Sequence, residues 1–524
     1  MRNFTKPGRS GVWADNGICA TSHPLAAQIG LDVLKSGGNA MDAAIAGAVA
    51  LGVCEPAMCG LAGDCFALVK PAGSDLVHSF NGSGRAPAGA DAQVLRNHGL
   101  SKIPDNNAQA VTLPGAVRAF DTMSAKWGRI GLADTLAPAI RYFDSGVPVH
   151  ERVALDWAEA APGLQGAAHR HFLPWGHAPR PGARFALPGQ AEVLRRIARD
   201  GAKAFYEGEV AEDMIAALQA RGGSHTAEDF ASVAVDETTP IKGSYHGADI
   251  YEHPPNGQGA TAILMLNILS QFDISSMDPL GAERAHLEAE AAKLAYAARN
   301  TFIADAAHAS ADKMLDPAYA TELAARIDPE RASDLDSRPE GQPHRDTIYI
   351  TVVDKDRMAV SLIYSVFSSF GSGIATEKFG LMLHNRGCGF SLTPGHANEL
   401  APGKRPLHTI IPGILAENGK PNMPFGVMGG QYQANGHARF VSNIRDFGMT
   451  PQQAIDAPRA FASDGVLSLE SSYATEVAQT LSDLGHKVDR NDDPIGGAQA
   501  IRIHDSGMLE AGSDPRKDGC ATGY

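Results

Sequence analysis

The feature that most constrains this chain is a run of β-branched and aromatic residues that begins directly after Thr347. Residues 348–353 predict a strand, residues 354–357 a turn and residues 358–364 a second strand. Two interpretations of Thr347 are open at this point. It is either a capping or surface residue of the hairpin, or the first residue of a new chain made by cutting the bond before it.

The second interpretation has a chemical basis, because a free α-amine can activate the hydroxyl of its own residue. Such an amine has an ordinary pKa of about 7.7–8.0 and so accepts a proton near neutral pH. The segment from residue 328 to residue 346 favours cleavage, since it is rich in proline and charge and has little to bury. This composition predicts a mobile connector that would let the bond bend toward its own side chain.

Composition indicates a large globular protein. The 524 residues are 44% hydrophobic, and the length alone favours about two to four domains. The net charge of −14 is spread along the chain, which argues against nucleic acid or an anionic membrane as the main partner. Residues 1–20 lack an apolar signal-peptide core, and polar residues interrupt the most apolar stretch at 40–62, so we expect a cytoplasmic protein without a membrane span.

The six cysteines form no CxxC pair and are few for the length, which predicts reduced and mostly buried thiols. Three of them, Cys54, Cys59 and Cys65, lie close together in the sequence. Their spacing fits no zinc pattern, so no metal site is predicted there.

Local patterns place several elements around these features. A helix is predicted from Ser22, which can cap it, and a second from Asn39 to about residue 53 that is apolar nearly all round. Short strands are predicted at 66–69 and 76–80, and helical patterns dominate residues 115–307. Two loops are candidates for a site: residues 81–88, which contain Arg85, and the pair Gly429-Gly430, whose backbone N–H groups could approach a ligand as an oxyanion hole.

Taken together, these residues resemble the γ-glutamyltransferase (γ-glutamyltranspeptidase) family of N-terminal nucleophile hydrolases. The resemblance covers nearly the whole length, with the motifs in the same order. The matching segments are 36–44 (SGGNAMDAA), 113–115 (LPG), 346–347 (DT) with 352–356 (VVDKD), 370–373 (FGSG), 404–406 (KRP), 429–430 (GG), 457–459 (APR), 513–516 (SDPR) and 523–524 (GY).

The resemblance implies an α+β protein folded as a four-layer αββα sandwich and made as a proenzyme, or zymogen, that cleaves itself between Asp346 and Thr347. Cleavage would give a large chain of residues 1–346 and a small chain of residues 347–524. In the family's scheme Thr347 is the nucleophile, Ser365 takes the place of a threonine that supports its amine, and Gly429 and Gly430 form the oxyanion hole.

The departures from the family pattern concern the substrate. Gly389 stands where γ-glutamyl enzymes have the aspartate that binds the substrate amine, Arg386 replaces a glutamine and Phe367 an asparagine. His408 and Thr409 replace the two serines that bind the substrate carboxylate. Ser83 stands at the position of a carboxylate-binding arginine, with Arg85 two residues further on.

These changes disfavour binding of a substrate with an α-amine, because a buried ammonium without a carboxylate partner costs several kcal/mol. They resemble the cytoplasmic branch of the family that includes oxamate amidohydrolase. The resulting hypothesis is a self-processed threonine amidohydrolase for a small carboxylate-bearing amide, with Arg85, Arg386, His408 and Thr409 in substrate binding. The alternatives are γ-glutamyl transfer or glutathione hydrolysis, and a non-catalytic family member that is never processed.

The resemblance implies no cofactor, since one residue supplies both base and nucleophile. The expected partners are the small-molecule amide and the two chains of one precursor, with a dimer of such heterodimers left open. Neither nucleic acid nor a membrane is expected as a partner.

Overall fold

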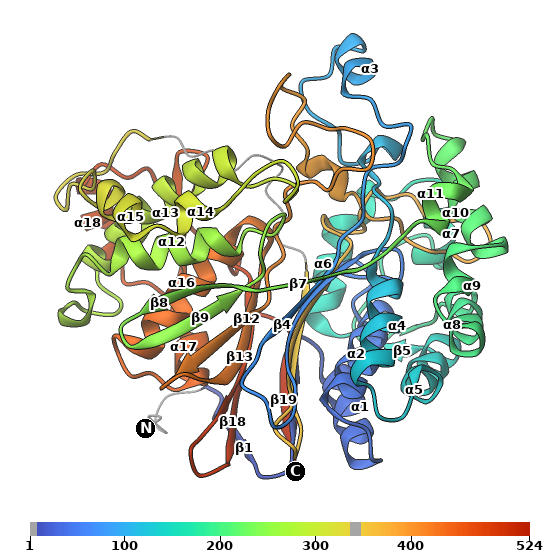
Figure 1. The fold of residues 1–524 in the computed structure, drawn as a ribbon, viewed down its shortest axis with the longest axis horizontal. Coiled ribbons are helices and arrows are strands. Elements are labelled where there is room, and N and C mark those ends of the chain that lie inside the picture. The colour runs from blue at the N-terminus through green and yellow to red at the C-terminus, as the bar shows by residue number, and fades with distance from the viewer. Residues whose placement is uncertain (1–7, 336–346) are drawn as a thin grey trace.

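The computed structural model describes residues 8–335 and 347–524, so Asp346 and most of the predicted connector lie outside the described residues. Two seven-stranded sheets face each other in the middle of the molecule, and helices cover both outer faces (Figure 1). This arrangement confirms the predicted α+β class and the four-layer αββα sandwich.

The first sheet contains the predicted hairpin as β10 and β11. Strands from before and after Thr347 alternate in it, because β10 pairs with β2 and β11 pairs with β3. Its strand order is β19 (Cys520–Gly523), β2 (Ile18–Thr21), β10 (Ile348–Val353), β11 (Ala359–Ser365), β3 (Asp64–Lys70), β4 (His78–Gly82) and β7 (Asp236–Thr238).

The second sheet ends beside the predicted oxyanion-hole glycines, since its longest strand, β13, stops at Met428. Its strand order is β1 (Val12–Ala14), β18 (Leu509–Ser513), β17 (Gly497–Ile503), β13 (Lys420–Met428), β12 (Gly413–Glu417), β9 (Ala248–Glu252) and β8 (Ile241–Tyr245). Two small sheets lie outside the sandwich: β14 (Ala460–Ser463), β15 (Val466–Glu470) and β16 (Val488–Asn491) in one, β5 (Val147–Pro148) and β6 (Arg184–Phe185) in the other.

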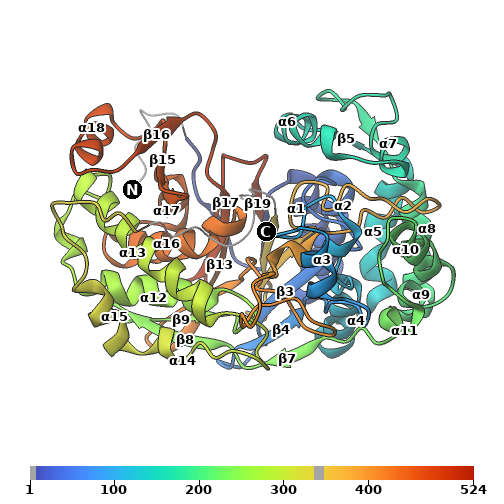
Figure 2. The same cartoon turned by 90° about the horizontal axis from the view of Figure 1, so that it is seen from above.

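Each sheet has its own helical layer, and the two layers lie on opposite sides of the molecule (Figure 2). The first sheet is covered by α1 (Pro24–Lys35), α2 (Ala40–Cys54), α4 (Ala116–Trp127) and α5 (Leu132–Ser145). The second is covered by α12 (Gly259–Leu269), α13 (Ala282–Phe302), α16 (Gln433–Arg445) and α17 (Pro451–Asp456). The remaining helices are α3 (Ala92–Asn97), α6 (Glu151–Ala160), α7 (Ala167–Phe172), α8 (Pro188–Asp200), α9 (Lys203–Tyr206), α10 (Glu209–Gln219), α11 (Ala227–Ala231), α14 (Asp312–Leu315), α15 (Pro317–Ala324) and α18 (Thr475–Asp483).

The predicted helix pair at the start of the chain is present, with one correction. Every residue of α2 is buried, as its apolar sequence predicts, and Asn39 caps it by accepting the N–H of the second and third helical residues. The cap of α1 is His23, whose Nδ1 accepts the Leu25 N–H at 3.2 Å. Ser22 does not cap α1, because its hydroxyl donates to the Glu55 carboxylate.

The prediction that helices dominate residues 115–307 missed two groups of strands: the two-residue strands β5 and β6, and the strands β7, β8 and β9. The last three lie at or near one edge of the two large sheets and are short, with alternating burial. No helix within residues 8–335 and 347–524 is long and apolar enough to cross a membrane. All six cysteines are free thiols, and five of them are buried.

Two clusters of buried side chains lie between the sheets. The one near Met428 contains Phe66, Tyr349 and Ile363 from the first sheet together with Ile410 and Met428. The other is aliphatic and joins Ala14, Ile501, Leu509 and Ala511 of the second sheet to Ile18, Ala20, Val353 and Ala359 of the first. Alternate residues of β10, such as Ile350, point the other way into the large core around α2.

Candidate active site

Three polar side chains from neighbouring strands form a row at one end of the first sheet. Ile348 pairs with Tyr364, so Thr347 lies opposite Ser365, and Ser365 pairs with Asp64. Directly opposed residues of antiparallel strands point to the same face of the sheet. All three side chains are fully buried, and Thr347 Oγ1 donates to Ser365 Oγ at 3.4 Å.

Ser365 is itself held by the backbone that follows it. Its Oγ accepts the N–H of Phe367 at 2.9 Å. Phe367 has a φ of +78°, a conformation that costs a bulky residue about 1–3 kcal/mol and is found mostly at functional sites. In this conformation its ring lies 4.1 Å from the guanidinium of Arg386, which connects the nucleophile candidate to a substrate-binding candidate.

Asp64 is the centre of a buried polar cluster. Its Oδ2 accepts Arg386 Nε at 3.0 Å and His408 Nε2 at 2.9 Å, and its Oδ1 accepts the N–H of Gly84 at 3.2 Å. His384 Nδ1 also lies 3.3 Å from Oδ2, in electrostatic contact although it is not aligned for a hydrogen bond. Both oxygens of Asp64 are thus occupied by groups of the protein.

The charge states of this cluster follow from burial and from these contacts. Burial alone would raise the pKa of Asp64, but the contacts with His384 and His408 outweigh burial and hold that pKa well below its ordinary value. Burial lowers the pKa of Arg386 to about 10, with Asp64 acting in the opposite direction. Burial and the nearby Arg386 lower the pKa of His408 to about 3, so this histidine is neutral at physiological pH.

The tautomer of His408 can be assigned from its neighbours. Its Nδ1 accepts the N–H of Ile410 at 3.3 Å, so the proton is on Nε2 and is donated to Asp64. Both ring nitrogens are therefore engaged within the protein. A direct contact between His408 and substrate stays a prediction.

Arg386 has one terminal nitrogen left for a ligand. Its Nη1 donates to Thr409 Oγ1 at 3.1 Å, whereas Nη2 is buried and has no hydrogen-bond partner among the described residues. A buried N–H group without an acceptor is costly and is uncommon in folded proteins. The planar guanidinium fork is best matched by a carboxylate.

Gly429 and Gly430 lie where β13 turns into the helix α16. Their φ values are +119° and +55°, and a Cβ on Gly429 would lie 2.9 Å from the Cα of Gly496. The N–H of Tyr432 donates to the carbonyl of Gly429 at 3.0 Å. Because a trans peptide is planar, fixing this carbonyl also fixes the direction of the Gly430 N–H.

Gln258 joins this glycine turn to the substrate-binding candidates. Its Nε2 donates to the carbonyl oxygens of Thr409, at 2.7 Å, and Gly430, at 3.4 Å. The structure therefore brings six predicted site residues into one connected network: Thr347, Ser365, Arg386, His408, Thr409 and Gly430.

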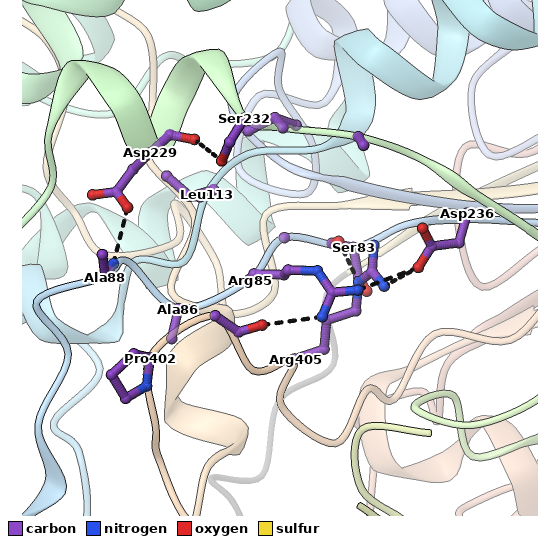
Figure 3. A pocket seen from close by; sticks show the side chains of 14 residues that line it. Ser83, Arg85, Ala86, Ala88, Leu113, Asp229, Ser232, Asp236, Pro402 and Arg405 are labelled. Atoms are coloured by element: carbon purple, nitrogen blue, oxygen red, sulfur yellow. Dashed lines mark hydrogen bonds and ion pairs between the residues drawn. The ribbon is translucent and has the colours of Figure 1, made fainter. Parts of the chain in front are cut away.

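Arg85 lies apart from this network, on a surface pocket of about 380 Å³ (Figure 3). Its side chain is 43% exposed and contacts Asp236 at 3.4 Å, Asp305 at 3.3 Å and the carbonyl of Gly403 at 3.0 Å. Figure 3 shows Arg85 and Arg405 converging on Asp236. Its guanidinium is thus already shared between two carboxylates.

One group of described residues has the composition of a metal site: His286, Glu290 and His486. These side chains already satisfy one another, since His286 Nδ1 lies 2.7 Å from His486 Nε2 and the Lys293 ammonium lies 2.7 Å from Glu290 Oε1. A lysine in that place supplies the positive charge that a metal ion would bring. The active-site candidates contain no comparable set among the described residues.

Asp64, His384 and Gln258 also belong to this site, although none of them was predicted from the sequence. Asp64 is an acid at the first position of a buried strand, which is a signal, because an unpaired buried carboxylate is strongly disfavoured. Gln258 lies in a loop between Pro255 and the apolar helix α12, but nothing in that loop indicates its two acceptors.

The arrangement combines three functions of an amide-cleaving site. It has a buried hydroxyl at a predicted chain end, a glycine turn with fixed peptide planes, and a guanidinium with an open nitrogen. Such groups could supply a nucleophile, stabilise an oxyanion and hold a carboxylate.

Comparison with known proteins supports this chemistry. Residues 26–524 match the family model described as Gamma-glutamyltranspeptidase. The chain is 36% identical over 525 residues to the Glutathione hydrolase-like YwrD proenzyme of Bacillus subtilis (strain 168), covering 97% of this chain and 98% of that protein. It is 34% identical over 528 residues to the Oxamate amidohydrolase proenzyme of Klebsiella pneumoniae subsp. pneumoniae, covering 97% and 98%.

The fold also matches a solved structure. The crystal structure of cephalosporin acylase from Bacillus halodurans superposes with a TM-score of 0.93 and 38% sequence identity, covering 100% of this chain and 99% of that one. The similarity confirms the N-terminal nucleophile hydrolase type of the sandwich. The chain therefore belongs to the γ-glutamyltranspeptidase family and is a hydrolase that acts on amide C–N bonds.

Proposed function

We propose that this protein is a self-cleaving threonine amidohydrolase that hydrolyses the amide of a small, carboxylate-bearing substrate such as oxamate. The observation that carries the proposal is the buried Nη2 of Arg386, which has no partner among the described residues. Arg386 is connected to Thr347 through Phe367 and Ser365, so a carboxylate held there would lie near the hydroxyl.

The proposed reaction begins with cleavage before Thr347, which gives chains of residues 1–346 and 347–524. The new α-amine then takes the proton of Thr347 Oγ as this oxygen attacks the substrate carbonyl. The N–H groups of Gly429 and Gly430 stabilise the oxyanion, with Ser365 holding the Thr347 hydroxyl. The leaving amine takes the proton, and water later attacks the ester to release the acid. For oxamate the products are oxalate and ammonia.

Two features disfavour a substrate with an α-amine. A Cβ on Gly389 would lie 2.6 Å from the carbonyl oxygen of Leu407, so this position has no room for an amine-binding aspartate. The nearby carboxylate of Asp64 already accepts from protein groups on both oxygens. An ammonium placed beside Arg386 would thus be buried without a counter-charge, which is strongly unfavourable.

The relatives' names support this class without singling out one substrate. One relative is named an oxamate amidohydrolase, another a glutathione hydrolase-like protein and a third a cephalosporin acylase. Hydrolysis or transfer of a γ-glutamyl group is the second candidate, since such a substrate also carries a carboxylate that Arg386 could bind. An inert protein that is never cleaved would remain a single chain of 55.0 kDa.

Intact-mass analysis and parallel assays test the proposal. We expect two chains with Thr347 at the new N-terminus, turnover of oxamate, and little turnover of γ-glutamyl-p-nitroanilide. Arg386→Met should raise KM for oxamate by roughly 10-fold or more, since a hydrogen bond to a charged group contributes about 1.5–3 kcal/mol. Arg85→Met is the matched comparison, and a smaller change is expected because Arg85 already pairs with Asp236 and Asp305. Strong γ-glutamyl turnover with weak oxamate turnover would contradict the proposal.

A further inference from the structure

Asp64 has no role in the reaction scheme above, although it contacts Arg386, His408 and Gly84 at the centre of the site. We infer that Asp64 is a positioning residue that holds Arg386 in the orientation needed to bind the substrate carboxylate. This inference rests on the proposed function, because it assumes that Arg386 is the carboxylate-binding group.

Asp64 is placed to act through other residues. It is fully buried, and its two oxygens accept from Arg386, His408 and Gly84. Both oxygens are therefore engaged by protein groups, whereas Arg386 keeps one terminal nitrogen without a partner among the described residues. We expect the substrate carboxylate to bind Arg386 and not Asp64, because two carboxylates repel each other.

The guanidinium of Arg386 is held in one orientation. Arg386 is bonded at Nε by Asp64 and at Nη1 by Thr409, and its face lies on the ring of Phe367. Three contacts on a planar, rigid group fix its plane and its rotation. The remaining nitrogen, Nη2, therefore points in a fixed direction. The entropy of ordering the Arg386 side chain is then lost on folding and not on substrate binding.

Asp64 is itself fixed by the first sheet and by His408. It occupies the first position of β3, opposite Ser365, so its backbone belongs to the same sheet as the hairpin that starts at Thr347. His408, as the Nε2–H tautomer, donates to the same Oδ2 and is held from behind by the Ile410 N–H. The register of one sheet thereby sets the distance between the carboxylate-binding arginine and the nucleophile.

Charge by itself does not explain the presence of Asp64. Burial lowers the pKa of Arg386, and the Asp64 carboxylate opposes that effect. The negative charge of Asp64 also weakens the attraction between Arg386 and a substrate carboxylate. On charge alone, Arg386 would bind the substrate more strongly without Asp64. Its presence is better explained by orientation and by the cost of an uncompensated buried guanidinium.

A double-mutant cycle tests the inference. Asp64→Ala, Arg386→Met and the double variant are assayed on whichever of oxamate and γ-glutamyl-p-nitroanilide the wild type turns over faster, since both carry a carboxylate. We expect Asp64→Ala to raise KM roughly 10-fold or more, with kcat changed less than about 3-fold. In the Arg386→Met background the same substitution should change KM less than about 2-fold, because the two residues act as one unit.

Two controls separate positioning from a structural role. Asp64→Asn retains an oxygen that can accept from Arg386 Nε, so its KM should lie between those of the wild type and Asp64→Ala; this variant also serves if the alanine protein fails to fold. Asp514→Asn alters another fully buried aspartate, one that pairs with Arg459 and Arg516, and should lower thermal stability without raising KM.

The outcomes distinguish the inference from the proposed function. An unchanged KM in Arg386→Met would refute the assignment of Arg386, and with it both proposals. A raised KM in Arg386→Met, with an Asp64→Ala effect that multiplies independently in the double variant, would refute the inference about Asp64 alone. A loss in kcat with unchanged KM would refute it as well, since Asp64 would then act on the chemistry and not on binding.

Discussion

Replacing Ser365 by alanine should have two effects, one on reaction rate and one on stability, and each can be calculated from one hydrogen bond. The Ser365 hydroxyl accepts from Thr347 Oγ1 at 3.4 Å and from the Phe367 N–H at 2.9 Å. The first bond orients the proposed nucleophile, and the second holds the turn that carries Phe367. We therefore expect Ser365→Ala to slow cleavage and turnover, and also to lower the stability of the fold.

The magnitudes follow from the two bonds. A neutral hydrogen bond contributes about 0.5–1.5 kcal/mol, so losing the one to Thr347 should slow each step by roughly 2- to 13-fold. The Phe367 N–H would be left buried without this acceptor, at a cost of about 1–3 kcal/mol. For a protein of 524 residues this corresponds to a fall in Tm of roughly 1–3 °C.

Ser361→Ala is the matched control on the same strand. Ser361 is also fully buried in β11, where its hydroxyl lies 2.7 Å from the Tyr349 hydroxyl and donates to the Phe425 carbonyl at 3.1 Å. It should lower Tm by a similar amount without slowing cleavage. Processing is measured as the disappearance of the 55.0 kDa chain with time. Equal cleavage and turnover rates in the two variants would refute the role given to Ser365.

Three further outcomes are expected. Thr347→Ala should remain one chain without amidase activity, as judged by intact mass, whereas Thr347→Ser should still be cleaved. Gly429→Ala should lower kcat by roughly 10²–10³-fold, because a Cβ there would lie 2.9 Å from the Cα of Gly496 and displace an oxyanion donor; a kcat within 3-fold of the wild type would contradict this. The third outcome concerns pH. Burial, the larger cause, and the nearby Arg386 lower the pKa of His408 from 6.5 to about 3, so between these values the unfolded chain binds a proton that the folded chain does not. Stability due to this group is full above pH 6.5 and is lost as the pH falls toward 3. The free energy of unfolding, measured with urea, should be lower at pH 5 than at pH 7. In the His408→Gln variant this pH-dependent loss should be smaller by roughly 2 kcal/mol than in the wild type.

The elements predicted best from the sequence are those whose local pattern and burial agree. The β-branched run of β10 is buried on both faces, and α2 is buried on all sides. In both elements the apolar sequence therefore predicts the observed burial. The strands β7 to β9 were missed because they have three to five residues each and alternate between more and less buried positions, so polar residues interrupt the apolar ones. Their place is set by pairing with β4 and β12, which the local sequence does not contain.

The site divides in the same way. Thr347 and the glycine pair could be predicted from local sequence. Thr347 directly precedes the strand β10, and Gly429 and Gly430 adopt positive φ values that favour glycine. The role of Asp64 could not be predicted in this way, because it depends on contacts with three residues more than 300 positions away in the sequence. Arg386 was singled out from the sequence, but its open nitrogen becomes evident only when the partners of its other nitrogens are known.

The alternation of strands around Thr347 has a consequence for the matured protein. Cleavage there would leave β10 paired with β2 and β11 paired with β3, both of which precede the cut, while β19 at the far end of the sequence also pairs with β2. The two products could separate only by breaking ladders in the middle of a sheet. The nicked protein should therefore sediment as one particle and melt in a single transition, and fragments synthesised separately should acquire this sheet only by folding together.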